Sequence, residues 1–165
     1  MYRKQGTSYR TIHPPANLHG HKWINTDAYD CEGLCARGIV SGRDLDGSDI
    51  YLGRANYNGD ILPAKIIPRN KAAYVAFAGE EIRVQHFQML VQPEYKWIAC
   101  QNGNVPTGAT PIGETLHGET LYAERVRAHG ALTVGKVHPS HKCCYIPFNG
   151  KEEKYTHYEV LVIQP

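Results

Sequence analysis

The most constraining feature of this sequence is an internal repeat. Shifting the chain by 71 residues places residues 39–91 on residues 110–162 without a gap, and 16 of the 53 aligned positions are identical. Upstream of this block, Trp23-Ile24 matches Trp97-Ile98 if the first copy carries three extra residues around positions 31–35. A repeat of this length is one structural unit that packs against its neighbour, so the sequence predicts two similar units within one fold.

Both copies are predicted to form short antiparallel strands. Residues 119–129 contain no Gly or Pro and resemble a helix, but the equivalent residues 48–58 include Gly53 and have a turn-forming end at Asn58, which favours a strand and its hairpin. The closing runs 86–91 and 157–162 alternate apolar and polar residues, as strands with one buried face do. Turns are expected at Asp46-Gly47, His117-Gly118, Asn58-Gly59, His129-Gly130, Gly79 and Gly150.

These patterns predict an all-β fold made of two tandem, closely packed antiparallel β repeats of about 70 residues. We assign residues 1–22 to an N-terminal extension, residues 23–92 to the first repeat and residues 93–165 to the second. The segment 92–96 between the two copies is too short to act as a free linker, so the copies are expected to pack together.

Charge and composition narrow the range of partners. The 18 Lys and Arg residues and the 16 Asp and Glu residues give a formal net charge of +2 without a block of like charge, so neither nucleic acid nor an anionic membrane is an expected partner. No apolar run approaches the length of a membrane span, and the first residues lack the apolar middle of a signal peptide. The five Cys, an odd number, suit reduced thiols. The sequence therefore predicts a cytoplasmic protein, with release or surface association by a non-classical route left open.

No pattern indicates an enzyme, a metal or a cofactor. Residues 130–136 have the glycine and lysine spacing of a phosphate-binding loop, but Val137 replaces the required Ser or Thr and His138-Pro139 prevents the following helix. None of the four serines lies in a nucleophile elbow. Two groups of Cys and His lack a familiar zinc spacing and are interpreted as reduced thiols and surface histidines: His19, His21, Cys31 and Cys35, and His138, His141, Cys143 and Cys144.

Three kinds of charged residue recur in the two copies, as Arg54 and Arg125, Lys65 and Lys136, and Glu81 and Glu152. Recurrence favours a structural role, and the carboxylates are expected to pair with the guanidinium groups. Each lysine follows a turn and ends a strand-like run, while Asp44-Leu45-Asp46-Gly47 forms an acidic loop. From residue chemistry alone, a solvated lysine and a turn-forming aspartate are favoured over a binding role.

The combined motifs resemble one known family. Each copy has a Trp near its start, an apolar-Tyr-x-x-Arg strand, a seven-residue run from Gly to Lys, a Tyr-x-x-Phe-x-Gly-x-Glu stretch and a closing strand. This set, over residues 23–162, resembles the DM-nine repeat family. That family includes the N-terminal repeats of natterin-like proteins and two-repeat, cytosolic invertebrate lectins that bind mannose in immune recognition.

The resemblance implies which residues bind sugar. In the mannose-binding relatives the ligands are an Asp two residues after the Gly that precedes the first tight turn, and the Lys that ends the Gly-to-Lys run. Asp44 and Lys65 match these positions in the first copy. The second copy keeps Lys136 but has Thr115 in place of the Asp, with the neighbouring Glu114 as a candidate substitute. Replacing Asp44 or Lys65 by Ala is therefore expected to cost more affinity than Lys136→Ala.

The function implied by the resemblance is that of a metal-independent lectin for mannose-type glycans in innate immune or host-surface recognition. An ionised Asp that accepts hydroxyl hydrogen bonds beside a Lys that donates them suits the neighbouring hydroxyls of a pyranose. The alternative is a protein-protein interaction scaffold built on the same repeats that binds no sugar. Expected partners are mannose or mannose-terminated glycans and a second copy of the chain, in a homodimer formed where the closing strand 157–162 leaves a sheet edge.

Overall fold

The computed structural model describes residues 21–164, and most of these residues lie in strands. The first copy contains β1 (Lys22–Asp27), the 3-10 helix η1 (Cys31–Arg37), β2 (Val40–Arg43), β3 (Asp49–Tyr57), β4 (Asp60–Ile67), η2 (Pro68–Asn70), β5 (Ala72–Phe77), β6 (Glu80–Val84) and β7 (His86–Val91). The second contains β8 (Glu94–Gln101), β9 (Pro111–Glu114), β10 (Thr120–Ala128), β11 (Ala131–His138), η3 (Pro139–His141), β12 (Cys143–Phe148), β13 (Lys151–Tyr155) and β14 (His157–Gln164). The predicted all-β fold is confirmed.

The strands recur with the offset found in the sequence. Strands β2 to β7 each begin 71 residues before strands β9 to β14. The turns between β3 and β4 and between β10 and β11 lie where they were expected, and their two central residues, Asn58-Gly59 and His129-Gly130, all have positive φ. Such turns match the twist of the strands that they join. The extra residues of the first copy form η1, which has no counterpart in the second copy.

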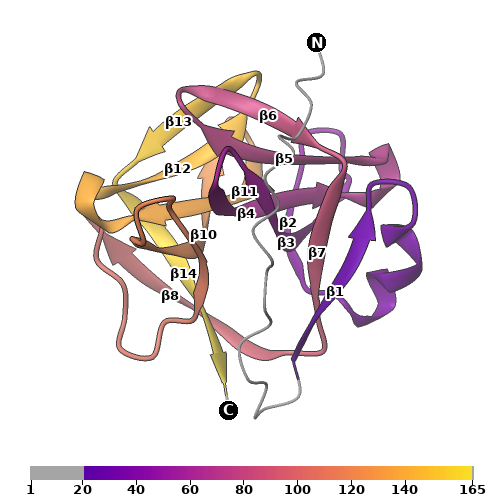
Figure 1. The fold of residues 1–165 in the computed structure, drawn as a ribbon, viewed down its shortest axis with the longest axis horizontal. Helices are drawn as coiled ribbons and strands as arrows, with labels where there is room; N and C mark the ends of the chain where they lie inside the picture. Colours follow the sequence, from indigo (N-terminus) through magenta and orange to yellow (C-terminus); the bar gives the residue numbers. More distant parts are fainter. Residues whose placement is uncertain (1–20, 165) are drawn as a thin grey trace.

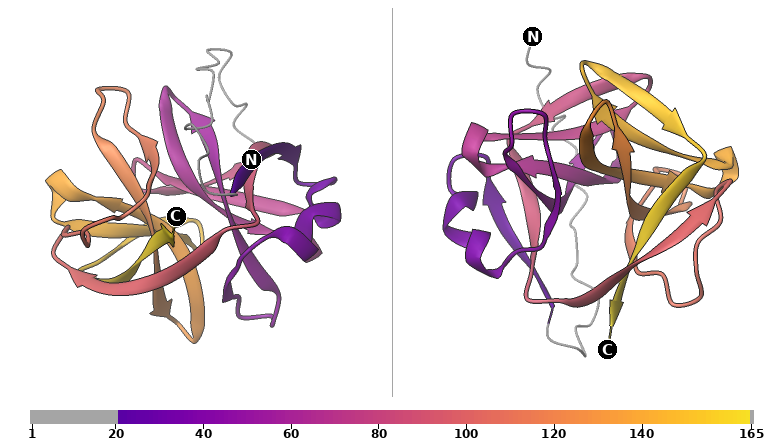
Figure 2. Two further views of the ribbon diagram at one scale, coloured as in Figure 1. Left: turned by 90° about the horizontal axis from the view of Figure 1, so that it is seen from below. Right: turned by 180° about the vertical axis from the view of Figure 1, so that it is seen from behind.

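The strands form one continuous hydrogen-bonded sheet in the order β1-β7-β3-β2-β11-β12-β13-β6-β5-β4-β9-β10-β14-β8, with β3–β4 and β10–β11 also paired. In Figure 1, β1 to β3 and β7 lie on one side and β8, β10 and β14 on the other. The hairpins β5–β6 and β12–β13 meet at the top of the same view, and Figure 2 shows the arrangement from below and from behind.

Among the strands described here, three pairings join the copies: β6 pairs with β13 through Glu80 and Lys151, and the other two pairings are reciprocal. Strand β2 pairs with β11 through Arg43 and Leu132, and β9 pairs with β4 through Glu114 and Ile61. These are equivalent positions under the 71-residue shift, so the copies exchange the same contact in both directions. The arrangement is an approximate twofold relation within one chain.

The recurring Gly42 and Gly113 allow this close approach of backbones. A Cβ on Gly42 would lie 1.9 Å from the carbonyl oxygen of Leu132, and a Cβ on Gly113 would lie 2.0 Å from that of Ile61. No other residue fits at either position without moving a strand.

The closing strand β14 is not a sheet edge, contrary to the prediction. It pairs with β8 along its whole length, and on its other side it pairs with β10 through Glu159 and Val160. In the part of the chain described here, the ends of the sheet are β1 and β8. The sequence pattern identified β14 as a strand, but its partners come from distant segments that local alternation does not reveal.

The largest apolar clusters fill the space within and between the copies. One is built from first-copy residues with Leu121, and a second contains residues of both copies. The members of this shared cluster are Trp23, Ile39, Ile50, Leu52, Ile67, Leu90, Ile112, Ala123, Val134, Leu161 and Ile163. Because both copies contribute to one core, they are packed as a single hydrophobic unit. Within residues 21–164 no helix is both long and apolar enough to cross a membrane.

Candidate functional site

Lys65 lies inside the protein, at the boundary between the two copies. Its side chain projects from β4 and is 3% exposed. The ammonium donates to Glu81 Oε2 on β6 at 3.1 Å and to the backbone oxygen of Pro147, which belongs to β12 of the second copy. The rings of Tyr74 and Phe148 lie 5.3 and 5.4 Å from Nζ, within range of cation-π attraction.

Lys136 has the equivalent environment, with the roles of the two copies exchanged. It is 6% exposed, and its Nζ lies 3.0 Å from Glu152 Oε2 and donates to the backbone oxygen of Ala76 at 2.8 Å. The rings of Tyr145 and Phe77 lie 5.5 and 5.9 Å away. Each of these partners is the 71-residue equivalent of a Lys65 partner, so the two buried lysines are related by the approximate twofold relation.

The glutamates that pair with the lysines also accept hydrogen bonds from the backbone of the other copy. Glu81 Oε1 accepts a hydrogen bond from Gly150 N at 3.2 Å, and Glu152 Oε1 accepts one from Gly79 N at 3.3 Å. The expectation of solvated lysines is therefore wrong, because both ammonium groups are enclosed by the packed hairpins. An ammonium has three N–H donors, and the two partners of Lys65 leave one donor for a ligand.

The expected pairing between the recurring glutamates and arginines is also wrong. Arg54 is 5% exposed and donates from Nε to Gln88 at 2.8 Å, while Arg125 donates from Nε to Glu159 at 3.0 Å. Burial lowers the pKa of Arg54 to about 10. These partners lie directly across the β3–β7 and β10–β14 junctions, whereas the recurring glutamates lie on hairpins that reach the other copy.

The Asp44 loop is a fixed turn. Gly47 N donates to the backbone oxygen of Asp44 at 3.0 Å, and Leu45 N donates to Asp44 Oδ1 at 2.8 Å. Asp46 accepts hydrogen bonds from the side chain of Asn70 and from the backbone of Ser48, and these lower the pKa of Asp46 to about 2. Within residues 21–164, Asp44 Oδ2 accepts no hydrogen bond, so this oxygen is available to a ligand.

Asp44 and Lys65 line the same hollow, as a shared binding site requires. Its volume is about 430 Å³. The first copy also contributes Leu45, Ile67, Asn70, Tyr74 and Glu81, and the second contributes His129, Phe148 and Asn149. A carboxylate, an ammonium group, amides and aromatic rings therefore converge on one small space, which can offer both hydrogen bonds and an apolar face to a polyhydroxylated ligand.

Of the ten residues that line the hollow, the sequence analysis predicted only Asp44 and Lys65 as site residues, and it placed none of the second copy there. His129, Phe148 and Asn149 come from the second copy, and the Nε2 of His129 is held by Glu153 at 2.9 Å. The sequence signal was the recurrence of the Phe-x-Gly-x-Glu stretch, which includes Phe148. That recurrence gave no indication that residues of both copies line one hollow.

The corresponding second-copy residues are differently arranged. Thr115 Oγ1 accepts a hydrogen bond from Glu119 N at 3.1 Å, so its hydroxyl closes the turn. Glu114 lies one residue earlier, in the β9 pairing with β4. His138 and His141 occupy the positions of Ile67 and Asn70, and their rings stack with centroids 3.5 Å apart. Burial lowers the pKa of His138.

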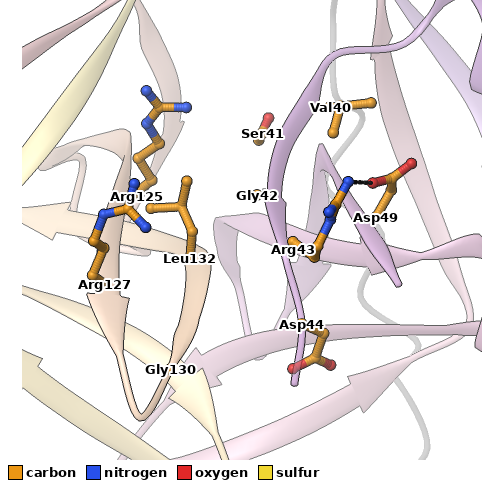
Figure 3. A pocket seen from close by; sticks show the side chains of 10 residues that line it. All are labelled: Val40, Ser41, Gly42, Arg43, Asp44, Asp49, Arg125, Arg127, Gly130 and Leu132. Atoms are coloured by element: carbon orange, nitrogen blue, oxygen red, sulfur yellow. Dashed lines mark ion pairs between the residues drawn. The ribbon is translucent and has the colours of Figure 1, made fainter. Parts of the chain in front are cut away.

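A second hollow, of about 410 Å³, adjoins the Asp44 loop (Figure 3). Arg125 and Arg127 from β10 lie across it from Arg43, whose Nη2 is 3.7 Å from Asp49 Oδ1. Asp44 lines this hollow as well as the first one. The two hollows are therefore neighbours, separated by the acidic turn.

The second copy also encloses an acid and two thiols. Glu124, Cys143 and Cys144 are fully buried, and burial raises the pKa values of Glu124 and Cys144. Of the Cys and His groups considered in the sequence, His19 lies outside the described residues. Within residues 21–164 no three His, Cys, Asp or Glu side chains are placed to hold a metal ion.

Comparison with known proteins places this geometry in a family. A family model described as "DM9 repeat" matches residues 44–155, which is more than half of the chain. Among solved structures, the nematode sperm cell motility protein MFP2B is similar with a TM-score of 0.65 and 17% sequence identity. The match covers 98% of this chain and 53% of that one, so the chain spans about half the length of MFP2B. At this identity the likeness concerns the fold alone. A search of curated proteins gave no match.

Proposed function

The chain belongs to the DM9 repeat family, and on that premise we propose that it is a carbohydrate-binding protein for mannose-type glycans. The ligand site is the hollow between Asp44 and Lys65. The observation that carries the proposal is that these two residues, singled out by their positions in the motif, line one hollow with an unused carboxylate oxygen and an ammonium donor.

The residue chemistry supports a neutral sugar as the ligand. Two neighbouring hydroxyls of a pyranose can donate to the Asp44 carboxylate and accept from the Lys65 ammonium. The rings of Tyr74 and Phe148 border the hollow and can pack against the apolar face of the sugar. Each charge-assisted bond is worth about 1.5–3 kcal/mol, so one sugar should bind with a dissociation constant between roughly millimolar and tens of micromolar.

The biological setting belongs to the same proposal. We place the protein in innate immune or host-surface recognition, in the cytoplasm or released or surface-associated by a non-classical route, and as a homodimer. Since β14 is paired on both sides, the dimer would use an edge strand such as β8, which has one hydrogen-bonded neighbour within residues 21–164. Two or more weak sites on one particle would raise the affinity for a polyvalent surface.

The proposal is tested by Asp44→Asn, which keeps the oxygen that accepts from Leu45 but removes the charge. Titration with methyl mannoside should show at least tenfold weaker binding at this site. Asp49→Asn is the matched control, because Asp49 lies in the same segment and lines only the second hollow. Binding should persist in EDTA, since the proposed ligands are a carboxylate and an ammonium group. If wild-type protein bound no mannoside at millimolar concentrations, the scaffold alternative would replace the proposal.

A further inference from the structure

The second copy has Thr115 at the position equivalent to Asp44, but a carboxylate of the first copy lies at this turn. We infer that Asp60, from the first copy, supplies the missing acid, so that Lys136 and Asp60 form a second sugar site equivalent to Lys65 and Asp44. The inference rests on the proposed sugar site in the first copy. It gives one chain two binding sites.

The turns that carry the two sites have the same backbone geometry. The first residue of each turn accepts a hydrogen bond from the glycine three residues later, at 3.0 Å for Asp44 and 2.9 Å for Thr115. The N–H of each first residue donates to the residue four positions later, at 2.9 and 2.8 Å. The backbone N–H groups of the two turns therefore occupy equivalent places in the fold.

One of these N–H groups locates the carboxylate in each copy. Leu45 N donates to Asp44 Oδ1 at 2.8 Å, and the equivalent Leu116 N donates to Asp60 Oδ1 at 2.7 Å. A carboxylate oxygen thus accepts a hydrogen bond from the equivalent N–H in both copies. In the first copy this carboxylate belongs to the turn itself, and in the second it belongs to the opposite copy. At the position equivalent to Asp60 the second copy has Ala131, so neither site has two such acids.

The packing of the hairpin tip explains how Asp60 reaches the turn. Asp60 begins β4 directly after Gly59, and a Cβ on Gly59 would lie 2.7 Å from the side chain of Leu116. The tip of the β3–β4 hairpin therefore rests on the Thr115 turn. Glu114, the substitute suggested by the sequence, occupies the position equivalent to Arg43 rather than Asp44.

The ammonium group of Lys136, like that of Lys65, keeps one N–H donor for a ligand. Lys136 interacts with Glu152 and with the backbone oxygen of Ala76, which leaves one of its three donors. The pair would take the same chemical class of ligand, two neighbouring hydroxyls of a pyranose. The surroundings differ, because His138 and His141 stand in place of Ile67 and Asn70. The two sites are therefore expected to differ in which further sugar units of a glycan they accept next to the bound mannose.

Nitrogen-15 NMR titration with methyl α-mannoside tests this inference, because the amides of Leu45 and Leu116 report on the two sites separately. In the wild-type protein both amide signals should shift with added mannoside. Asp60→Asn keeps an oxygen for the Leu116 N–H but removes the charge. It should weaken the Leu116 response by tenfold or more and leave the Leu45 response unchanged. Asp44→Asn is the matched variant and should have the reverse effect.

The two proposals fail in different ways. If only Leu45 responds in the wild-type protein, or if Asp60→Asn leaves the Leu116 response unchanged, the second site is wrong while the first stands. If neither amide responds at saturating mannoside, the proposed function itself fails. An Asp60→Asn protein whose Leu116 affinity falls while its melting temperature stays at the wild-type value would support a ligand role over a role in holding the turn.

Discussion

Replacing Lys65 by Met should destabilise the protein as well as weaken binding. Methionine preserves much of the side-chain volume between Tyr74 and Phe148 but leaves Glu81 as an unpaired charge that is only 15% exposed. Removing one partner of a buried ion pair costs about 3–5 kcal/mol. For a chain of 165 residues, about 2–4 °C of melting temperature is lost per kcal/mol, so the midpoint should fall by about 6–20 °C.

Thermal and urea unfolding followed by circular dichroism measure this change. The matched control is Arg43→Met, since Arg43 and Asp49 form a pair 3.7 Å apart whose side chains are 72% and 45% exposed. Such exposed pairs contribute about 1 kcal/mol or less. Adding Glu81→Gln to Lys65→Met should restore part of the loss by removing the unpaired charge. A Lys65→Met protein as stable as Arg43→Met would refute the argument from burial.

Two further predictions concern stability. Glu124 is buried, and burial raises its pKa, so the folded state favours the protonated form. The free energy of unfolding should therefore fall by about 1.4 kcal/mol for each unit that the pH rises between about pH 4.3 and the folded pKa. Urea unfolding across this range should show that slope in the difference between wild-type protein and Glu124→Gln, because the other titrating groups cancel in that difference, whereas the exposed control Glu94→Gln should follow the wild-type protein; a constant difference for Glu124→Gln would disprove it. Gly42→Ala should cost about 1–3 kcal/mol or more, because its Cβ would meet the Leu132 oxygen, whereas a Cβ on Gly33 meets nothing within 4 Å. Equal melting temperatures for Gly42→Ala and Gly33→Ala would contradict this reasoning.

The elements that the sequence predicted correctly are those specified locally. Asn58-Gly59 and His129-Gly130 adopt positive φ, which these residue types tolerate best, and the turns follow from that chemistry. Comparing the copies also resolved the ambiguous segment 119–129, because its equivalent contains Gly53 and β10 is indeed a strand. Local preference and repetition together were sufficient for the fold class.

The site depended on contacts that local preference does not encode. Lys65 has no apolar sequence signal, and it is buried because Glu81 and the Pro147 carbonyl satisfy its charge. The carboxylate near Thr115 comes from Asp60, which lies in the other copy. The motif identified Asp44 and Lys65, but only the three-dimensional arrangement shows that they share a hollow and which distant residues complete it.

This exchange of contacts gives a physical reason for the presence of two copies in one chain. An isolated first copy would keep the Lys65–Glu81 pair but would lose the Pro147 carbonyl that accepts from Lys65 and the Gly150 N–H that donates to Glu81. It would also expose the first-copy members of the shared apolar cluster to water, at a cost of about 25 cal/mol for each Å² of apolar surface, against a total folding stability of about 5–15 kcal/mol for an ordinary domain. The same separation would remove Phe148 from the hollow. Under the proposed function, folding and ligand binding therefore depend on the same inter-copy contacts.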